Sequence, residues 1–355
     1  MKIVNSLPEP VWSAYVQNHA HSNIFHSPEM FQVYARAKGH EPGLWAALNE
    51  KDRPTALFLP VKVSVMGGAL KRLTSRSISY GSVLCDPGPQ GSESLAALLE
   101  AYKQDIKKTV LFTELRNVTD TEPLQPVLQS SGFAYEEHIN YLIDLDCTKK
   151  DLMERLGKRT RKHIRRALRK EEMTIEEATG EDQVKACYDL LEKTYRRAGV
   201  FLADHSLFDA AFHVLYPKGM VRFLLVRVEG SYAASSVELL FKDTVYGWFS
   251  GLDRAFQRYN PNEFLMWHIL EWAIDKGYRC YDFGGAGDPD EEYGVRDFKA
   301  KFRGDLVSYG RNIYVHSPLR LRLSKLGYKA YQKILSKKSP KGVIIHSDEK
   351  DSEQR

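Results

Sequence analysis

The sequence contains few cysteines, and their spacing fits neither a disulfide framework nor a zinc site. Cys85, Cys147, Cys187 and Cys280 lie far apart, and none forms a C-x-x-C pair. Structural zinc sites and disulfide-stapled folds use closely spaced cysteines. We therefore expect no metal and a reducing compartment, the cytoplasm.

Long apolar runs are also absent. No stretch approaches the roughly 18 apolar residues of a membrane-spanning helix, and the N-terminal MKIVNSLPEPVWSAY lacks the continuous apolar segment of a secretory signal. The sequence predicts a protein that is neither exported nor membrane-spanning.

Several enzyme classes lack their motifs. The chain contains no G-x-S-x-G nucleophile elbow, no G-x-x-x-x-G-K-[ST] phosphate loop and no G-x-G-x-x-G between a strand and a helix. These motifs place a nucleophilic serine, nucleotide phosphates and a dinucleotide, respectively. We therefore expect neither nucleotide hydrolysis nor dinucleotide redox chemistry, and no cofactor.

What is present is a two-domain globular composition. A chain of 355 residues is too long for one ordinary core. Its composition, 43% apolar and 27% charged, is average for a globular protein. Strand, strand, helix and strand occur in that order twice, at 55–65, 77–84, 92–107 and 110–116, and at 232–241, 244–252, 262–276 and 279–283. The order predicts an α+β fold with two modules of one plan.

The first clear helix signal is at Ser27. Ser27 suits the N-cap, Pro28 the first helical position and Gly39 the stop. For the whole chain we expect an N-terminal domain over 1–146 and a C-terminal domain over 172–316.

Between these domains lies the most basic segment, a predicted connecting helix over 147–171. Leu152, Leu156, Ile164 and Leu168 recur at helical spacing, so one face should pack on a core. The remaining faces carry Lys158, Arg159, Arg161, Lys162, Arg165, Arg166, Arg169 and Lys170. Such a surface either serves solubility or binds phosphates or nucleic acid, and the density of cations favours binding.

A second basic segment is the predicted C-terminal helix over 317–338. Apolar residues alternate there with Arg and Lys, which fits a helix docked on its own protein or one lying on anionic lipid. We favour docking because aromatic anchors are few. The polar segment 339–355 is predicted to be disordered.

The densest concentration of glycines, acids, bases and aromatics is YRCYDFGGAGDPDEEYGVRDFKAKFRG, residues 278–304. Gly284, Gly285 and Gly287 let another group approach the backbone closely. The acidic run that follows, and the cations after it, are consistent with a self-neutralising loop or with a substrate site. Both interpretations stay open on spacing alone.

Together with RTRKHIRRALRK, RRAGVF, VYGWFSGLD and NEFLMW in order, the segment YDFGGAG…YGVRDFKAKFRG resembles the FemABX peptidoglycan-bridge aminoacyltransferases and FemAB-like members of the GNAT superfamily. The resemblance covers roughly residues 3–315. It implies two tandem GNAT-type domains, with mixed sheets flanked by helices, that transfer an acyl group to an amine.

The resemblance also implies catalytic residues. Lys299 matches the family lysine that neutralises charge at the reacting end, and Phe298 would pack beside it. Asp282 and Glu292 are candidate proton acceptors, although Asp282 at a strand end is equally suited to a structural hydrogen bond. The sequence departs from the family pattern at Arg303, where FKxxFGG has its first glycine, so the loop is either shifted or carries an extra cation.

Binding roles follow from the same resemblance. Lys38 and Arg197 lie where the family places cations for the acceptor's phosphate and carboxylate groups, and Lys38 also suits a helix C-terminus. The remaining substrate-binding candidates are Tyr246, Phe298, Gly284 and Gly285. The candidates for binding a phosphate-bearing donor are Arg161, Arg165, Arg169, Arg254 and Arg258.

The chemical class of the acyl donor can be inferred from one turn in the sequence. GNAT enzymes hold CoA pyrophosphate with a glycine-rich turn, and the corresponding stretch 254–262 has no glycine. We expect an aminoacyl-tRNA donor and a muropeptide-type acceptor, although the family's coiled-coil insertion is missing. The alternatives are an acyl-CoA N-acyltransferase acting on an amino sugar, and a tandem GNAT scaffold that binds RNA or an anionic membrane. DNA is not expected as a partner; a peripheral position at the inner membrane face is kept as a secondary expectation.

Overall fold

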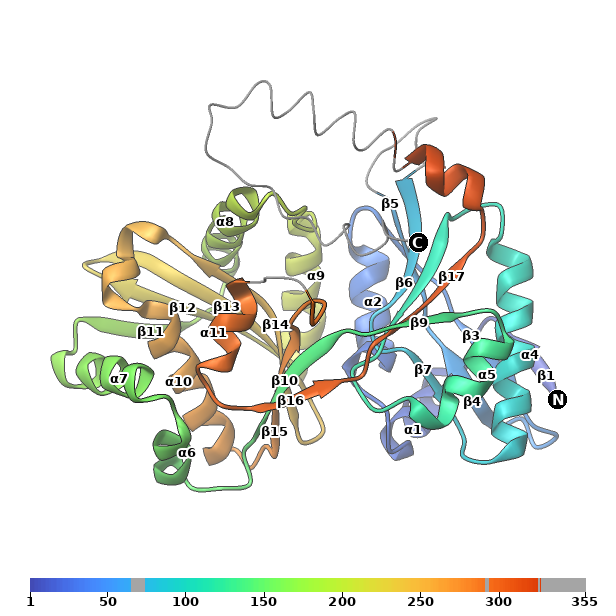
Figure 1. Ribbon diagram of the computed structural model, residues 1–355, viewed down its shortest axis with the longest axis horizontal. Coiled ribbons are helices and arrows are strands. Elements are labelled where there is room, and N and C mark those ends of the chain that lie inside the picture. The colour runs from blue at the N-terminus through green and yellow to red at the C-terminus, as the bar shows by residue number, and fades with distance from the viewer. Residues whose placement is uncertain (65–73, 291–293, 325, 327–355) are drawn as a thin grey trace. The chain divides into compact units, whose positions relative to one another are not determined.

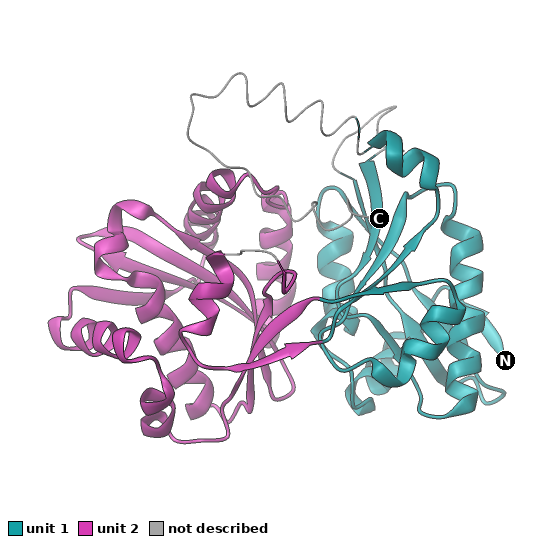
Figure 2. Cartoon of the chain, viewed as in Figure 1, with its two compact units in different colours: residues 1–137, 309–342 teal, residues 138–308, 343–355 magenta. Residues whose placement is uncertain are grey.

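The chain forms two compact units in a computed structural model that describes residues 1–64, 74–290, 294–324 and 326. Unit 1 is Met1–Glu137 together with the chain from Tyr309, and unit 2 is His138–Ser308 (Figures 1 and 2). Within the described residues, the chain passes from unit 1 into unit 2 and then returns to unit 1.

Unit 1 contains two sheets. The four-stranded sheet has the order β1-β3-β4-β7, and the six-stranded sheet has the order β2-β5-β6-β8-β17-β9. The strands are β1 (Lys2–Val4), β2 (His40–Pro42), β3 (Trp45–Leu48), β4 (Pro54–Phe58), β5 (Val61–Ser64), β6 (Ser75–Ser79), β7 (Val83–Cys85), β8 (Phe112–Arg116), β9 (Ala134–Glu136) and β17 (Arg311–Val315). The helices are α1 (Glu9–Asn18), η1 (Ile24–His26), α2 (Pro28–Arg36), α4 (Pro89–Ile106), η3 (Glu122–Leu124) and α5 (Gln125–Ser130).

The core of unit 1 forms under α4. Leu95, Leu98 and Leu99 recur at helical spacing and are fully buried. Tyr102 extends the same face, and its hydroxyl is bonded to Ser77 at 2.7 Å. A buried hydroxyl must be paired in this way because an unpaired one costs free energy.

Unit 2 contains one seven-stranded sheet of order β11-β12-β13-β14-β15-β10-β16. Its strands are β10 (Ile139–Asp144), β11 (Met173–Glu177), β12 (Val221–Val228), β13 (Ser231–Phe241), β14 (Thr244–Leu252), β15 (Cys280–Gly285) and β16 (Asp305–Ser308). Its helices are α6 (Lys149–Arg155), α7 (Lys158–Lys170), α8 (Glu181–Ala198), α9 (His205–Leu215), η4 (Tyr216–Lys218), η5 (Arg254–Tyr259), α10 (Pro261–Asp275) and α11 (Gly294–Ala300).

Helices cover both faces of this sheet, as the alternation along β12 shows. Leu224 and Val226 join the buried cluster that contains α10, whereas Phe223 contacts Phe212 of α9. Successive strand residues face opposite sides, so α10 and α9 lie on opposite faces. A strand buried on both faces reads as an apolar run, and Phe223–Val226 at the centre of β12 is such a run.

The helix signal at Ser27 is confirmed. The Ser27 side chain accepts from the Met30 amide, Pro28 is the first residue of α2, and Gly39 has a φ of +80°. The helix ends earlier than the glycine suggested, at Arg36. Helix α1, which precedes it, has no side-chain N-cap bond and carried no comparable signal.

The prediction of one connecting helix over 147–171 is wrong. The segment consists of two helices, α6 and α7, which break at Leu156 and Gly157 and belong to unit 2 rather than joining the units. Leu152 and Ile164 are buried as expected, but Leu168 is 44% exposed. The apolar stripe is therefore shorter than periodicity predicted.

The predicted domain bounds 1–146 and 172–316 also differ from the structure. β10 belongs to unit 2 because it pairs with β15 and β16. β17 belongs to unit 1 because it pairs with β8 and β9. Hydrogen bonding between strands distant in sequence decides both assignments.

Only the first part of the predicted C-terminal helix is described, with residues 318–324 helical. Arg320 donates to the carbonyls of Lys107, Lys108 and Val110, but Leu319 and Leu323 are 74% and 60% exposed. The described turns are thus held by an arginine rather than by docked leucines. The predicted disordered segment 339–355 lies outside the described residues. None of the helices in the described ranges is long and apolar enough to cross a bilayer.

Candidate active site at the end of strand β15

Strands β14 and β15 are parallel and separate after a short pairing. Their register runs from Thr244 opposite Cys280 to Tyr246 opposite Asp282. β14 then continues to Leu252 and β15 to Gly285 without further pairing between them. Beyond Tyr246 and Asp282, the two strands therefore make no backbone hydrogen bonds to each other. Strand backbone that is unpaired on one side is suited to binding an extended ligand.

Lys299 binds the backbone at the end of β15. It lies on α11, is 7% exposed, and its Nζ donates to the carbonyl oxygens of Phe283, Gly284 and Gly285 at 2.7, 3.0 and 2.7 Å. An ammonium group has three donors. These carbonyls occupy them, so in this conformation Lys299 positions the strand end rather than presenting a donor to a substrate.

Arg296 binds the segment that follows. Its Nε and Nη1 donate to the carbonyls of Ala286 and Pro289, both at 3.1 Å, and its Nη2 donates to the Asp288 carbonyl. Both cations thus bond backbone carbonyls of the loop, and the prediction of a self-neutralising loop stays open because residues 291–293 of its acidic run lie outside the described residues. Two α11 side chains together hold the turn after β15.

Side chains of the protein itself pack closely against Gly284 and Gly285. Gly284 has a φ of +67°, and a Cβ there would lie 3.0 Å from the Tyr246 hydroxyl. A Cβ on Gly285 would lie 2.5 Å from Nε2 of His138. Tyr246, which the resemblance suggested, is therefore brought to the strand end, together with His138, which sequence reasoning missed because nothing near it in sequence marks it.

Asp282 is a buried carboxylate, 4% exposed. Its Oδ1 accepts from the Asn140 side-chain amide and from the Gly284 amide. Burial raises the pKa of Asp282 to about 6, and these hydrogen bonds and the Lys299 charge oppose the rise. The predicted structural hydrogen bond is thus present, and it fixes the turn at Gly284.

A second buried carboxylate was not predicted. Glu238 on β13 is 2% exposed and accepts from the Tyr281 hydroxyl at 3.1 Å. Burial raises the pKa of Glu238 to about 7. Gly247 admits this pair, because a Cβ there would lie 2.5 Å from the Tyr281 oxygen. A single Glu within an apolar strand was the available signal.

Two other predicted positions complete this region. Phe298 packs on Phe302 with ring centroids 5.4 Å apart and lies against the core of unit 2. Arg303 has a φ of +58°, the left-handed region that glycine adopts most readily. The departure from the family glycine therefore conserves a glycine-like conformation and adds a cation. Glu292 lies outside the described residues.

Arg197, predicted to bind the acceptor, and Arg254, predicted to bind the donor, lie close together near the end of β14. Arg197 donates from Nη1 to the Leu252 carbonyl at 3.4 Å. Burial and then the adjacent Arg254 charge lower the pKa of Arg197. Lys193 lies nearby and pairs with Asp253 at 2.7 Å. The cluster carries more positive than negative charge, which suits an anionic group.

Arg258 is differently placed. It is 71% exposed in its side chain, stacks on Tyr259 and lies 3.5 Å from Glu229. Because its charge is matched by a carboxylate, it is a weaker donor-binding candidate than Arg254. Both lie on η5, a 3₁₀ helix capped by Asp253, rather than on an open turn.

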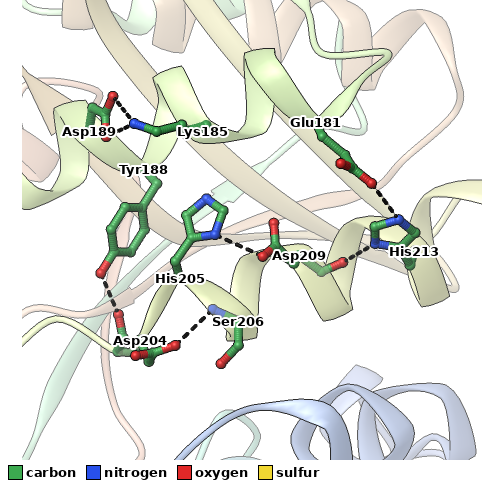
Figure 3. Close-up of polar contacts among 10 residues, drawn as sticks. Glu181, Lys185, Tyr188, Asp189, Asp204, His205, Ser206, Asp209 and His213 are labelled. Carbon is green, nitrogen blue, oxygen red and sulfur yellow. Dashed lines mark hydrogen bonds and ion pairs between the residues drawn. The ribbon is translucent and has the colours of Figure 1, made fainter.

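The segment that carries Arg197 is held by polar contacts between α8 and α9 (Figure 3). His213 bridges Glu181 at 3.1 Å, and His205 bonds Asp209 at 2.8 Å within α9. The Tyr188 hydroxyl donates to the Ala203 carbonyl at 3.1 Å. The Tyr188 bond holds the loop between the two helices, and the Glu181–His213 pair joins the start of α8 to the end of α9.

Helix α7 presents the cations predicted to bind phosphate. Arg165 and Arg169 are exposed and Arg161 is half-buried. Of the eight α7 cations, Lys170 is the one that forms an ion pair with an acid in the described part of the chain. Arg161 and Arg169 donate to helix carbonyls instead.

Glu263 anchors α7 to the segment after α11. It lies in the first turn of α10, is 5% exposed, and binds His163 of α7 at 2.8 Å and Lys301 at 3.0 Å. The Gly157 amide also donates to the Lys301 carbonyl. One buried acid therefore links the basic helix to the residues next to Lys299.

Lys38 lies in unit 1, two residues beyond α2, and is exposed. In the same unit, Glu114 binds Arg116 at 3.1 Å and Arg311 at 2.9 Å. Burial would raise the pKa of Glu114, but these arginines and Arg76 outweigh it and lower the pKa to about 2.

Comparison with known proteins identifies the fold. A family model described as an acetyltransferase (GNAT) domain matches residues 155–299. The crystal structure of FemX superposes with a TM-score of 0.69 at 16% identity, covering 92% of this chain and 99% of that one. The chain therefore contains a GNAT domain and shares its tandem GNAT fold with FemX.

Other solved structures share this fold. The C-terminal domain of a putative lysylphosphatidylglycerol synthetase from Agrobacterium fabrum has a TM-score of 0.55 at 12% identity, covering 89% and 93% of the two chains. A tandem GNAT protein from the clavulanic acid pathway has a TM-score of 0.56 at 10% identity, covering 88% and 99%. No curated protein sequence matches. The predicted fold and the acyltransferase class are confirmed.

Proposed function

We propose that this protein transfers an aminoacyl group from aminoacyl-tRNA to an amine of a cell-envelope precursor. The observation that carries the proposal is the basic helix α7, whose exposed cations are mostly unmatched by acids among the described residues. Close like charges destabilise a helix unless a polyanion neutralises them. A tRNA backbone supplies such phosphates without any need for sequence readout.

The position of α7 supports the same proposal. Glu263 ties α7 to Lys301, two residues from Lys299. A donor held on α7 would therefore be held by an element fixed to the site at the end of β15. The neighbour structures are of a FemX and of a lysylphosphatidylglycerol synthetase domain, names that fit an aminoacyl donor.

Within the site, the residues take distinct roles. An alkyl amine is almost wholly protonated at pH 7, so it must lose a proton before it attacks the ester carbonyl, and Asp282 and Glu292 remain the candidate acceptors of that proton. We assign Lys299 and Asp282 to positioning the turn at Gly284 and Gly285, where Tyr246 and Phe298 face the donor. Lys38 and Arg197 remain the candidates for the acceptor's anionic groups, a muropeptide being the acceptor expected from the resemblance.

An acyl-CoA donor is the second candidate, with an amino sugar as acceptor. The neighbouring Arg197 and Arg254 favour it, because two adjacent cations would bind a pyrophosphate through their side chains. A scaffold that binds RNA or an anionic membrane without turnover is the third.

Donor use separates these functions. The protein is incubated with labelled aminoacyl-tRNA or labelled acetyl-CoA, plus muropeptide and amino-sugar acceptors, and label transfer is followed. Transfer from tRNA alone supports the proposal, transfer from acetyl-CoA alone contradicts it, and RNA binding without transfer supports the scaffold.

The basic helix is tested separately. Replacing Arg161, Arg165 and Arg169 with Gln should weaken tRNA binding and reduce its salt slope by roughly 0.7–0.9 per lost phosphate contact. A matched control replaces three other cations of unit 2, Lys150, Lys185 and Lys242, and should leave the slope unchanged. An unchanged slope in the α7 variant would make this helix ordinary surface.

A further inference from the structure

Unit 2 contains a cavity of about 340 Å³ that none of the site residues lines. Its walls come from the ends of β11 and β13, the start of β12, η4 and the end of α10. The size is within the usual range of small-ligand sites, which is roughly 300–1,000 Å³. Its lining includes Glu177, Tyr216, Arg222, Trp272, Lys276 and Tyr278.

The cavity is remote from the end of β15. Leu240 lines it, and its register partner Val245 is opposite Tyr281, near the start of β15. Lys299 binds the other end of the same strand. Tyr281 and Gly285 are four residues, roughly 13 Å, apart on β15, and β13 lies two strands, roughly 10 Å, from β15 in the sheet. A ligand in the cavity would therefore not occupy the transfer site.

Arg222 gives this cavity its chemical character. It is 7% exposed, and its Nε and Nη2 donate to Glu177 at 3.0 and 2.6 Å. Its guanidinium carbon lies 3.8 Å from the ring centroid of Trp272. The third nitrogen, Nη1, is buried and has no hydrogen-bond partner. A buried donor left unpaired is costly, so an acceptor that entered here would be stabilised.

The other walls define the shape and charge of that acceptor. Arg222 and Lys276 contribute two positive charges and Glu177 one negative charge, which leaves one positive charge unmatched in the lining. Tyr216, Trp272 and Tyr278 supply aromatic surface, and the Trp272 and Tyr278 rings lie 5.5 Å apart. Such walls favour a flat ring over a highly hydrated ion.

We propose that this cavity is a second ligand site, distinct from the transfer site, that binds a small aromatic monocarboxylate. The carboxylate would accept from Nη1 of Arg222 and from Lys276, since the planar fork of an arginine matches a carboxylate. The ring would pack against Trp272 and Tyr278. The proposal does not depend on the identity of the acyl donor.

The full-length protein is titrated with 2-naphthoate and with the uncharged 2-naphthamide, using calorimetry and tryptophan fluorescence. We expect 1:1 binding of naphthoate with a Kd below about 1 mM and at least about tenfold weaker binding of the amide. Equal binding of the two probes, or no binding of naphthoate, would overturn the proposal.

Variants locate the site. Lys276→Gln and Arg222→Lys should each weaken naphthoate binding about 5- to 20-fold, and Lys150→Gln on α6 is the matched control that should not. Circular dichroism checks that each variant is folded, and Lys276→Gln at a helix end keeps the test valid if the Arg222 variant unfolds. Unchanged affinity in Lys276→Gln, or competition by inorganic phosphate at the same concentration as naphthoate, would contradict the assignment.

Discussion

Replacing Lys299 with Met should destabilise the end of β15 as well as reduce transfer. The change keeps the length of the side chain but removes bonds to three backbone carbonyls at a position only 7% exposed. A hydrogen bond from a charged group contributes about 1.5–3 kcal/mol. Because the three bonds share one ammonium and do not add, we expect a loss of about 3–5 kcal/mol, comparable to breaking a buried ionic contact.

The effect should be local as well as global. Urea unfolding measures the loss of stability, and amide hydrogen exchange over residues 283–287 measures the opening of the turn. Lys299 also stabilises the ionised form of Asp282. Its removal should raise the pKa of Asp282 further above about 6, so a transfer rate that depends on ionised Asp282 would shift its pH profile to higher pH.

Arg296→Met provides the matched comparison, because it releases the carbonyls of the same turn and leaves Lys299 in place. If Lys299 acts by positioning, both variants should lose transfer in proportion to lost stability. A Lys299→Met protein with wild-type stability and wild-type exchange would refute the structural argument. A loss of transfer far beyond that of Arg296→Met would restore the direct catalytic role expected from the resemblance.

Other predictions concern single residues whose conformation or charge is constrained. Arg303→Gly should increase the free energy of unfolding by at most about 1 kcal/mol and so raise the melting temperature, because the residue has a φ of +58° that glycine adopts without strain; a lower melting temperature would show that the cation is needed. Glu238→Gln should stabilise the protein increasingly as pH rises from 4.5 to 8, by up to about 3 kcal/mol, because the folded pKa is about 7 and the wild-type contribution is lost as pH rises through it; a pH-independent difference would contradict this. Glu114→Gln should destabilise by about 3 kcal/mol at pH 7 and progressively less as pH falls from 4.5 towards 2, because Arg116 and Arg311 hold the Glu114 pKa down; urea titrations across pH check both carboxylates.

The sequence predicted the fold well where local signals agree with packing. The order of strands and helices, the N-cap at Ser27 and the resemblance around residues 278–304 led to a tandem GNAT architecture. The domain bounds were less predictable, because strand pairing between residues distant in sequence decides them. Nothing local in β17 indicates that it pairs with β8 rather than with the strand that precedes it.

The candidate site was only partly predictable for a related reason. The glycines were expected to make room for substrate, and the structure fills that room with Tyr246 and His138. His138 is distant in sequence from Gly285 and reaches it only because β10 lies beside β15. A close approach can be inferred from glycine, but the identity of the approaching group depends on the sheet order.

The cations show most clearly what sequence leaves open. Lys299, Arg296 and the α7 residues all appear in one sequence as positive charges near glycines or other cations. In the structure, Lys299 and Arg296 donate to carbonyls of the chain itself, whereas most α7 cations are exposed and unmatched by described acids. A cation whose donors are satisfied internally stabilises the fold, and an exposed unmatched cation remains available to a ligand. Burial therefore separates the residues that shape the site from those that would recruit its substrate.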